Sequence, residues 1–97
     1  MSTLTNITAN GTYDIQPTGQ DIQVAVIVHA DATFGSGTLT FLTRSVDESG
    51  DGETLDTNPS TIAAGHQQRF LIGKNMLLQA KLAGATSPDI NITHTTL

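Results

Sequence analysis

The chain is 97 residues long, which is enough for one domain with a single hydrophobic core. Four Lys and Arg residues and a net charge of −5 exclude the clustered basic face that nucleic acids and anionic membranes require. The lack of cysteine excludes disulfides and thiolate metal sites, and it favours assembly in a reducing cytoplasm.

Alternation of apolar and polar residues predicts strands in the first half of the chain. Branched aliphatic residues fill every second position of residues 22–28, and successive side chains of a strand point to opposite faces. Asn10-Gly11 predicts a tight turn, because both residues tolerate a positive φ. We expect strands at residues 3–8, 12–16, 21–30 and 38–46, with turns or loops at 10–11, 17–19, 31–37 and 47–52.

The second half continues the alternation with one ambiguous segment. Residues 75–83 are rich in Leu, Lys, Gln and Ala, which favour a helix by propensity. The segment is short and lies between Gly73 and Gly84, so we expect a strand there. Further strands are expected at residues 53–60, 66–73, 76–83 and 89–96, and the structure of residues 61–64 is left open.

About seven or eight short strands at a spacing of 8–12 residues are typical of an all-β fold. We therefore predict a single antiparallel β-sandwich or small barrel, of jelly-roll or immunoglobulin-like type, over residues 1–97.

The acidic turn after the fourth expected strand holds the one candidate metal site. Asp47, Ser49 and Asp51 occupy positions 1, 3 and 5 of a pattern that resembles a calcium-binding EF-hand loop, with Gly52 at position 6. Position 12 is Asn58 rather than a bidentate Glu, and strands rather than helices flank the loop. The pattern favours a solvated, charged hairpin loop over a weak calcium site.

Patterns typical of catalysis are lacking. The three histidines lie on separate expected elements without the spacing of metal ligands. The serines have no nucleophile-elbow context, and Gly35-Ser36-Gly37 lacks the Lys and the helix of a phosphate-binding loop. We therefore expect that the protein is not an enzyme and needs no cofactor.

Several expected strands carry aliphatic residues on the face that also bears polar residues. Such faces are too apolar to be fully solvated and too polar to form a core. Burial against another subunit and ordinary scattered surface residues explain them about equally well. The candidate interface residues are Leu4, Ala25, Ile27, Leu71 and Leu77.

Three segments carry a resemblance to a known group of proteins: ITANGTYDIQPTGQDIQVAVIV, GTLTFLTRSVD and KLAGATSPDINI. Together they resemble small structural proteins of tailed bacteriophages, which have an early Asn-Gly turn and a Gly-Thr-rich central strand. Such proteins end with a Gly-Ala-Thr-x-Pro-x-Ile turn, which here begins at Gly84. The acidic loop departs from the pattern, because relatives often carry an aromatic residue after the central strand.

The resemblance implies a component of the virion that is assembled in the cytoplasm of the host bacterium. Its most specific implication is a capsid decoration or cement protein, whose partners are the major capsid protein and copies of itself. A homo-oligomer is implied, with a trimer as one arrangement. The resemblance also implies a short N-terminal arm, residues 1–8, that adds a strand to the edge of a partner. On that expectation, deleting the arm would weaken binding to the particle and leave the domain folded. A tail, head–tail connector or fibre component is the alternative, and a carbohydrate-binding module is a third class. The first residues lack the features of a signal peptide, and no apolar run reaches the ~20 residues of a membrane span.

Overall fold

The computed structural model describes residues 2–17, 22–54 and 64–96. Within these ranges the secondary structure is all strand, and no helix that could cross a membrane is found there. The expected extended segment at 55–60, and residues 18–21 and 61–63, lie outside the described residues. The strands are β1 (Ser2–Ile7), β2 (Gly11–Pro17), β3 (Ile22–Val28), β4 (Thr38–Ser45), β5 (Glu53–Thr54), β6 (Gln67–Ile72), β7 (Met76–Ala83) and β8 (Ile90–Thr96).

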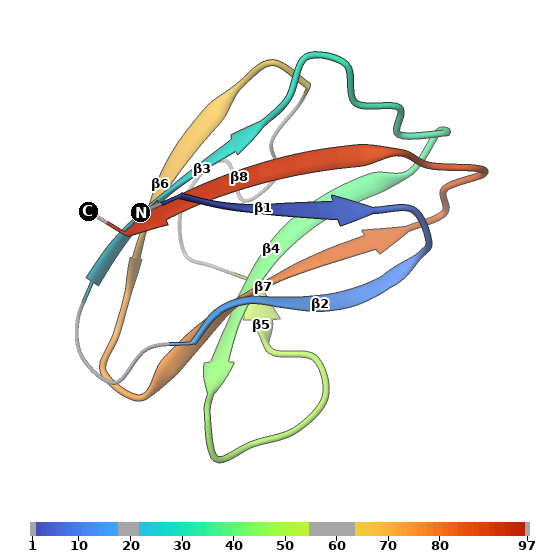
Figure 1. The fold of residues 1–97 in the computed structure, drawn as a ribbon. Coiled ribbons are helices and arrows are strands. Elements are labelled where there is room, and N and C mark those ends of the chain that lie inside the picture. The colour runs from blue at the N-terminus through green and yellow to red at the C-terminus, as the bar shows by residue number, and fades with distance from the viewer. Residues whose placement is uncertain (1, 18–21, 55–63, 97) are drawn as a thin grey trace.

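The strands form two four-stranded sheets that pack face to face (Figure 1). The first sheet has the order β1-β8-β3-β6 and the second has the order β2-β7-β4-β5, with every pairing antiparallel. β1 pairs with β8, β2 with β7, β3 with β6 and β4 with β5, which is the arrangement of a jelly roll. The predicted all-β sandwich is therefore confirmed, and residues 76–83 form a strand rather than a helix.

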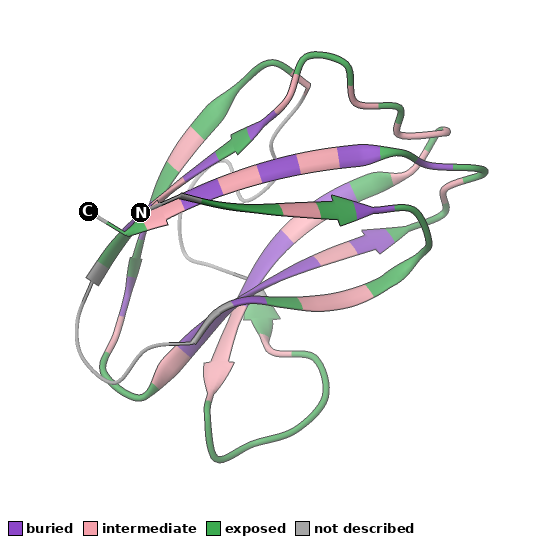
Figure 2. Ribbon diagram, in the orientation of Figure 1, coloured by how far each residue is buried: buried purple, intermediate pink, exposed green. Residues whose placement is uncertain are grey.

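The core fills the space between the two sheets, and its side chains come from alternate positions of nearly every strand. Burial along β8 alternates residue by residue, as the bands of Figure 2 show. The rings of Phe41 and Phe70, one from each sheet, lie with centroids 5.2 Å apart. The buried core residues are Ile7, Ile15, Val24, Val26, Val28, Leu39, Phe41, Phe70, Ile72, Leu78, Ala80, Leu82, Ile90 and Ile92.

The expected N-terminal arm is instead a strand of the sandwich. β1 pairs with β8 at six consecutive positions, from Ser2 opposite Thr95 to Ile7 opposite Ile90. Ile7 is completely buried. Because this segment covers part of the core, it is not a detachable arm.

His94 is an exception within the core. It lies on β8 at an inward position and is 4% exposed. Its Nδ1 atom has no hydrogen-bond partner within the described part of the chain. Burial therefore lowers the pKa of His94 below its ordinary value of 6.5, because the imidazolium form loses its hydration.

We expect this histidine to make the domain less stable at acidic pH. The pKa is lower in the folded than in the unfolded state, so below pH 6.5 the unfolded chain binds the proton preferentially. The stability that comes from the neutral imidazole is full above the unfolded pKa and falls as the pH drops towards the folded pKa. Urea unfolding at a series of pH values should show this slope for the native chain and a flatter one for His94→Leu. His66→Gln, at an exposed position, should keep the native slope, and equal slopes for all three proteins would contradict the assignment.

Candidate interaction surface

The outer face of the first sheet carries most of the candidate interface residues. Residues on its strands that alternate with the core positions point away from the second sheet. Leu4 on β1, Ala25 and Ile27 on β3 and Leu71 on β6 all lie at such positions. The outward positions are Leu4, Asn6, Gln23, Ala25, Ile27, Gln67, Arg69, Leu71, Asn91, Thr93 and Thr95.

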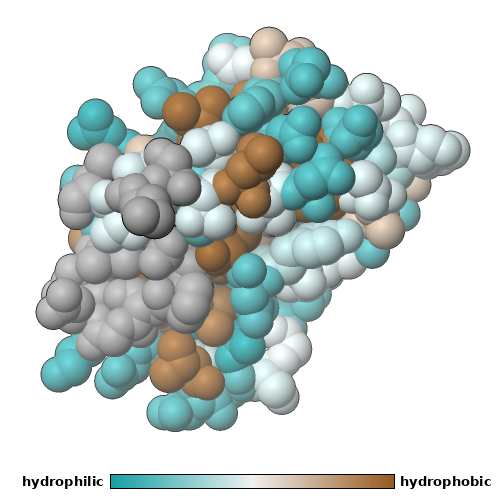
Figure 3. Space-filling view, viewed as in Figure 1, coloured by the Kyte–Doolittle hydropathy of each residue, from teal (hydrophilic) through white to brown (hydrophobic). Residues whose placement is uncertain are grey.

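The strand register places these residues in rows across the sheet. Ile27 lies opposite Thr93, and Thr93 lies opposite Leu4, so two aliphatic side chains flank one threonine. Leu4, Ile27 and Leu71 are 62%, 42% and 67% exposed, whereas ordinary core neighbours are fully covered. Figure 3, which views the side where β1 and β2 run, shows apolar residues as separate patches among hydrophilic and neutral ones. The outward positions of the first sheet themselves combine exposed aliphatic and polar side chains, so this face is mixed, as the sequence indicated.

This face is also poor in charge. Among its outward positions, Arg69 is the one charged side chain, and it lies opposite Ala25. Threonine, glutamine and asparagine supply the other polar groups, and His29 Nε2 shares a 2.7 Å hydrogen bond with Thr93 Oγ1. The depletion of charge is a feature that this surface shares with the cores of protein interfaces.

Leu77 does not belong to this surface. It lies on β7 in the second sheet and is 6% exposed, so it has no free surface to offer a partner. It lies outside the main core cluster, at an outward position of the strand opposite Arg44. The chain after β4 folds back onto this outer face, where the backbone of Gly50 and Gly52 contacts Gln79.

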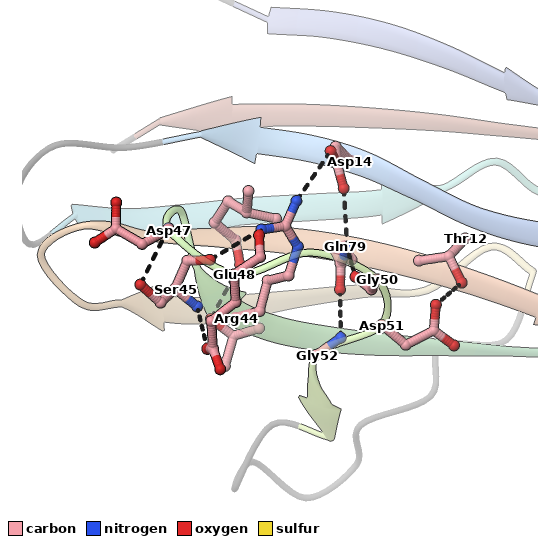
Figure 4. Close-up of polar contacts among 12 residues, drawn as sticks. Thr12, Asp14, Arg44, Ser45, Asp47, Glu48, Gly50, Asp51, Gly52 and Gln79 are labelled. Carbon is pink, nitrogen blue, oxygen red and sulfur yellow. Dashed lines mark hydrogen bonds and ion pairs between the residues drawn. The ribbon is translucent and has the colours of Figure 1, made fainter.

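Gln79 holds this returning loop in place, as Figure 4 shows. Its side chain is 2% exposed and uses its whole amide group. Its Oε1 accepts a 2.8 Å hydrogen bond from the Gly52 backbone N–H. Its Nε2 donates to Asp14 Oδ1 at 3.0 Å and to the Gly50 carbonyl at 3.1 Å. Gln79 therefore joins β2, β7 and the loop, a role that sequence reasoning missed.

Arg44 fastens the first part of the same loop. Its guanidinium forms an ion pair with Asp14 at 3.7 Å and donates hydrogen bonds to the carbonyls of Ser45 and Glu48. The Arg44 side chain is 14% exposed, so part of this pair is shielded from water. Arg44 and Gln79 both alternate with core positions, which indicated that they share the outer face of neighbouring strands. Their hydrogen-bond partners could be identified only from the tertiary structure.

The candidate cation ligands are separated within the loop. Asp47 and Asp51 lie at opposite ends of the cluster in Figure 4. The Asp51 carboxylate is 2.8 Å from Lys81 Nζ and accepts a 2.7 Å hydrogen bond from Thr12 Oγ1. These two contacts, Lys81 first, lower the pKa of Asp51 and keep it ionised. Asp51 thus serves to fasten the loop, and the described residues contain no group of three His, Cys, Asp or Glu that could hold a metal.

The described surface includes three depressions large enough to admit a small ligand. One, of about 320 Å³, lies on the second sheet beside Asp51, Glu53 and Lys81. A second is lined by the returning loop and Arg44, and the third by Ile27, His29 and their neighbours. None of the three is lined by a Phe, Tyr or Trp side chain, which a sugar-stacking platform would need.

Comparisons of the chain with known proteins found no match. No family model matches it, and neither a curated protein nor a solved structure is significantly similar.

Proposed function

We propose that this protein is a virion structural protein, and specifically a decoration protein that binds the outer shell of a tailed bacteriophage capsid. The observation that carries the proposal is the outer face of the first sheet, which is broad, poor in charge and dotted with exposed aliphatic residues. The resemblance of three segments to phage structural proteins gives the class of partner. The jelly roll is compatible with this role, although the same fold serves many functions.

The face binds through shape complementarity rather than through a catalytic or ligand-binding site. Four strands of six or seven residues present a flat footprint of roughly 400 Å², about half of what each partner buries in a standard interface. One copy therefore binds weakly, and stable attachment depends on many copies or on linked copies. Leu4, Ile27 and Leu71 supply the apolar contacts, and threonine hydroxyls supply adaptable hydrogen bonds.

Binding to capsid shells tests the proposal. Purified protein is mixed with expanded shells of the major capsid protein encoded in the same phage genome, and the pelleted complex is quantified. We expect the native chain to decorate the shells and Ile27→Asp to lose about tenfold or more in affinity, because it buries a carboxylate in the contact. Val46→Asp is the matched control, since Val46 is an equally exposed aliphatic residue (41% against 42%) outside this face.

Two outcomes would overturn the proposal. The first is a native chain that does not pellet with the shells. The second is equal loss of binding by Ile27→Asp and Val46→Asp. Binding to isolated tails in place of shells would favour the tail or connector alternative.

A further inference from the structure

Among the described strands, each sheet of the sandwich ends in two edge strands, whose outer backbone groups pair with no other described strand. The first sheet ends in β1 and β6, and the second ends in β2 and β5. Exposed edges invite pairing with another chain, so proteins blunt them with charges, prolines, bulges or short length. The four edges of this protein differ in these devices.

Three of the edges are guarded. β2 contains the charged Asp14, a register shift between Asp14 and Gln16, and Pro17 at its end. The described part of β5 is two residues long and begins with the charged Glu53. β6 carries the exposed cation Arg69 at its centre. Each of these strands therefore resists the addition of a further strand.

β1 has none of these devices. It is six residues long, and its register with β8 is unbroken. No charged side chain and no proline occurs in residues 1–13 of the sequence. No strand within the described ranges pairs with its other edge.

We propose that β1 is a self-pairing edge, along which a second copy of this chain adds its own β1 in antiparallel orientation about a two-fold axis. A chain with a net charge of −5 repels its copies over most of its surface. β1 is the edge along which two copies can meet without bringing like charges together. A two-fold axis makes the contact isologous, so one strand supplies both halves. This inference does not depend on the proposed function.

The sheet geometry restricts the register of this pair. Residues directly opposite each other in an antiparallel pair must point to the same face. A two-fold axis at Leu4 meets this condition, because it places Leu4 against Leu4 on the outer face and Thr3 against Thr5 on the inner side. The exposed leucine thereby loses part of its contact with water, and the threonines form cross-strand pairs of a favourable type.

The dimer would join the two first sheets into one continuous eight-stranded sheet. The outer faces of the two first sheets then lie side by side. The dimer thereby presents twice the area of charge-poor surface that one molecule presents. The two β6 strands lie at the far ends of this sheet, roughly 34 Å apart at the usual strand spacing. The Leu71 side chains are therefore far from each other, whereas the Leu4 side chains are in contact.

Single cysteines test this geometry cleanly, because the native chain has none. Directly opposed residues have Cα atoms about 4.5–5.5 Å apart, which lies within the range that a disulfide spans. Under mild oxidation we expect Leu4→Cys to form covalent dimers at least about tenfold faster than Leu71→Cys, since pairing raises the effective concentration. The two positions are similarly exposed (62% and 67%), so simple collision would give similar rates.

Sedimentation of cysteine-free protein provides the second measurement. The native chain should shift from monomer to dimer as its concentration rises to the millimolar range. Leu4→Lys should stay monomeric with an unchanged unfolding transition, because it places two ammonium groups at the axis on an exposed position. A monomeric native chain at millimolar concentration, a dimer that survives Leu4→Lys, or equal oxidation rates at the two cysteines would each overturn the proposal.

Discussion

Deletion of residues 1–8 is expected to unfold the domain. The deletion removes β1, its six-position pairing with β8 and the completely buried Ile7. It also uncovers Ile90 and Ile92, which face the core from β8. Loss of one large buried aliphatic side chain alone costs about 2–5 kcal/mol, and a small domain has about 5–15 kcal/mol in total. Circular dichroism should show loss of the cooperative thermal transition.

Two point substitutions in the same strand separate core packing from surface contact. Ile7→Ala should lower the free energy of unfolding by about 2–5 kcal/mol, because the cavity it leaves is enclosed. Leu4→Ala, three residues earlier and largely exposed, should change it by less than about 0.5 kcal/mol. If the truncated protein keeps its thermal transition, or if the two substitutions have equal effects, residues 1–8 are a detachable arm rather than a strand of the sandwich.

Substitution of Gly52 by Ala is expected to detach the loop that covers the second sheet. A Cβ atom at this position would lie 2.2 Å from the Thr43 carbonyl oxygen and 2.9 Å from Arg44 Cβ. The backbone must therefore move away from β4, which costs about 1–3 kcal/mol. The move also breaks the hydrogen bond from Gly52 N–H to buried Gln79, which adds about 1–3 kcal/mol. Urea unfolding and limited proteolysis of the loop should show the two effects together.

Gly50→Ala is the matched control within the same loop. Gly50 has a φ of +81°, so alanine is strained there by about 1–2 kcal/mol, but no atom lies within 4 Å of the added Cβ. We expect a smaller loss of stability than for Gly52→Ala and no increase in loop cleavage. If both variants cleave alike, close packing of Gly52 against β4 does not hold the loop.

The strands were predictable because alternation is a local property of the sequence. Buried Val24, Val26 and Val28 lie at the alternate positions that indicated a strand, and the spacing of turns indicated the number of strands. The helix-favouring composition of residues 76–83 was overridden by pairing with two neighbouring strands. The strand order itself was not predictable, because it depends on contacts between residues far apart in the chain.

The arm illustrates how the same residues admit two interpretations. Leu4 and Ile7 differ little in the sequence, and both are aliphatic residues in a short polar segment. Pairing with β8 decides that Ile7 is buried and Leu4 exposed. An N-terminal segment next to a tight turn is an arm or an edge strand depending on whether a neighbouring strand is free to receive it.

The sequence alone determined that this protein is a cysteine-free, acidic β domain with aliphatic residues on the outward faces of its strands. The tertiary structure decided which of those residues are available to a partner. Leu71 and Leu77 both alternate with core positions, yet one is 67% exposed and the other 6%. The physical reason is that alternation selects a face, whereas exposure depends on what packs over that face. Within the described residues, the loop held by Gln79 folds onto the outer face of the second sheet.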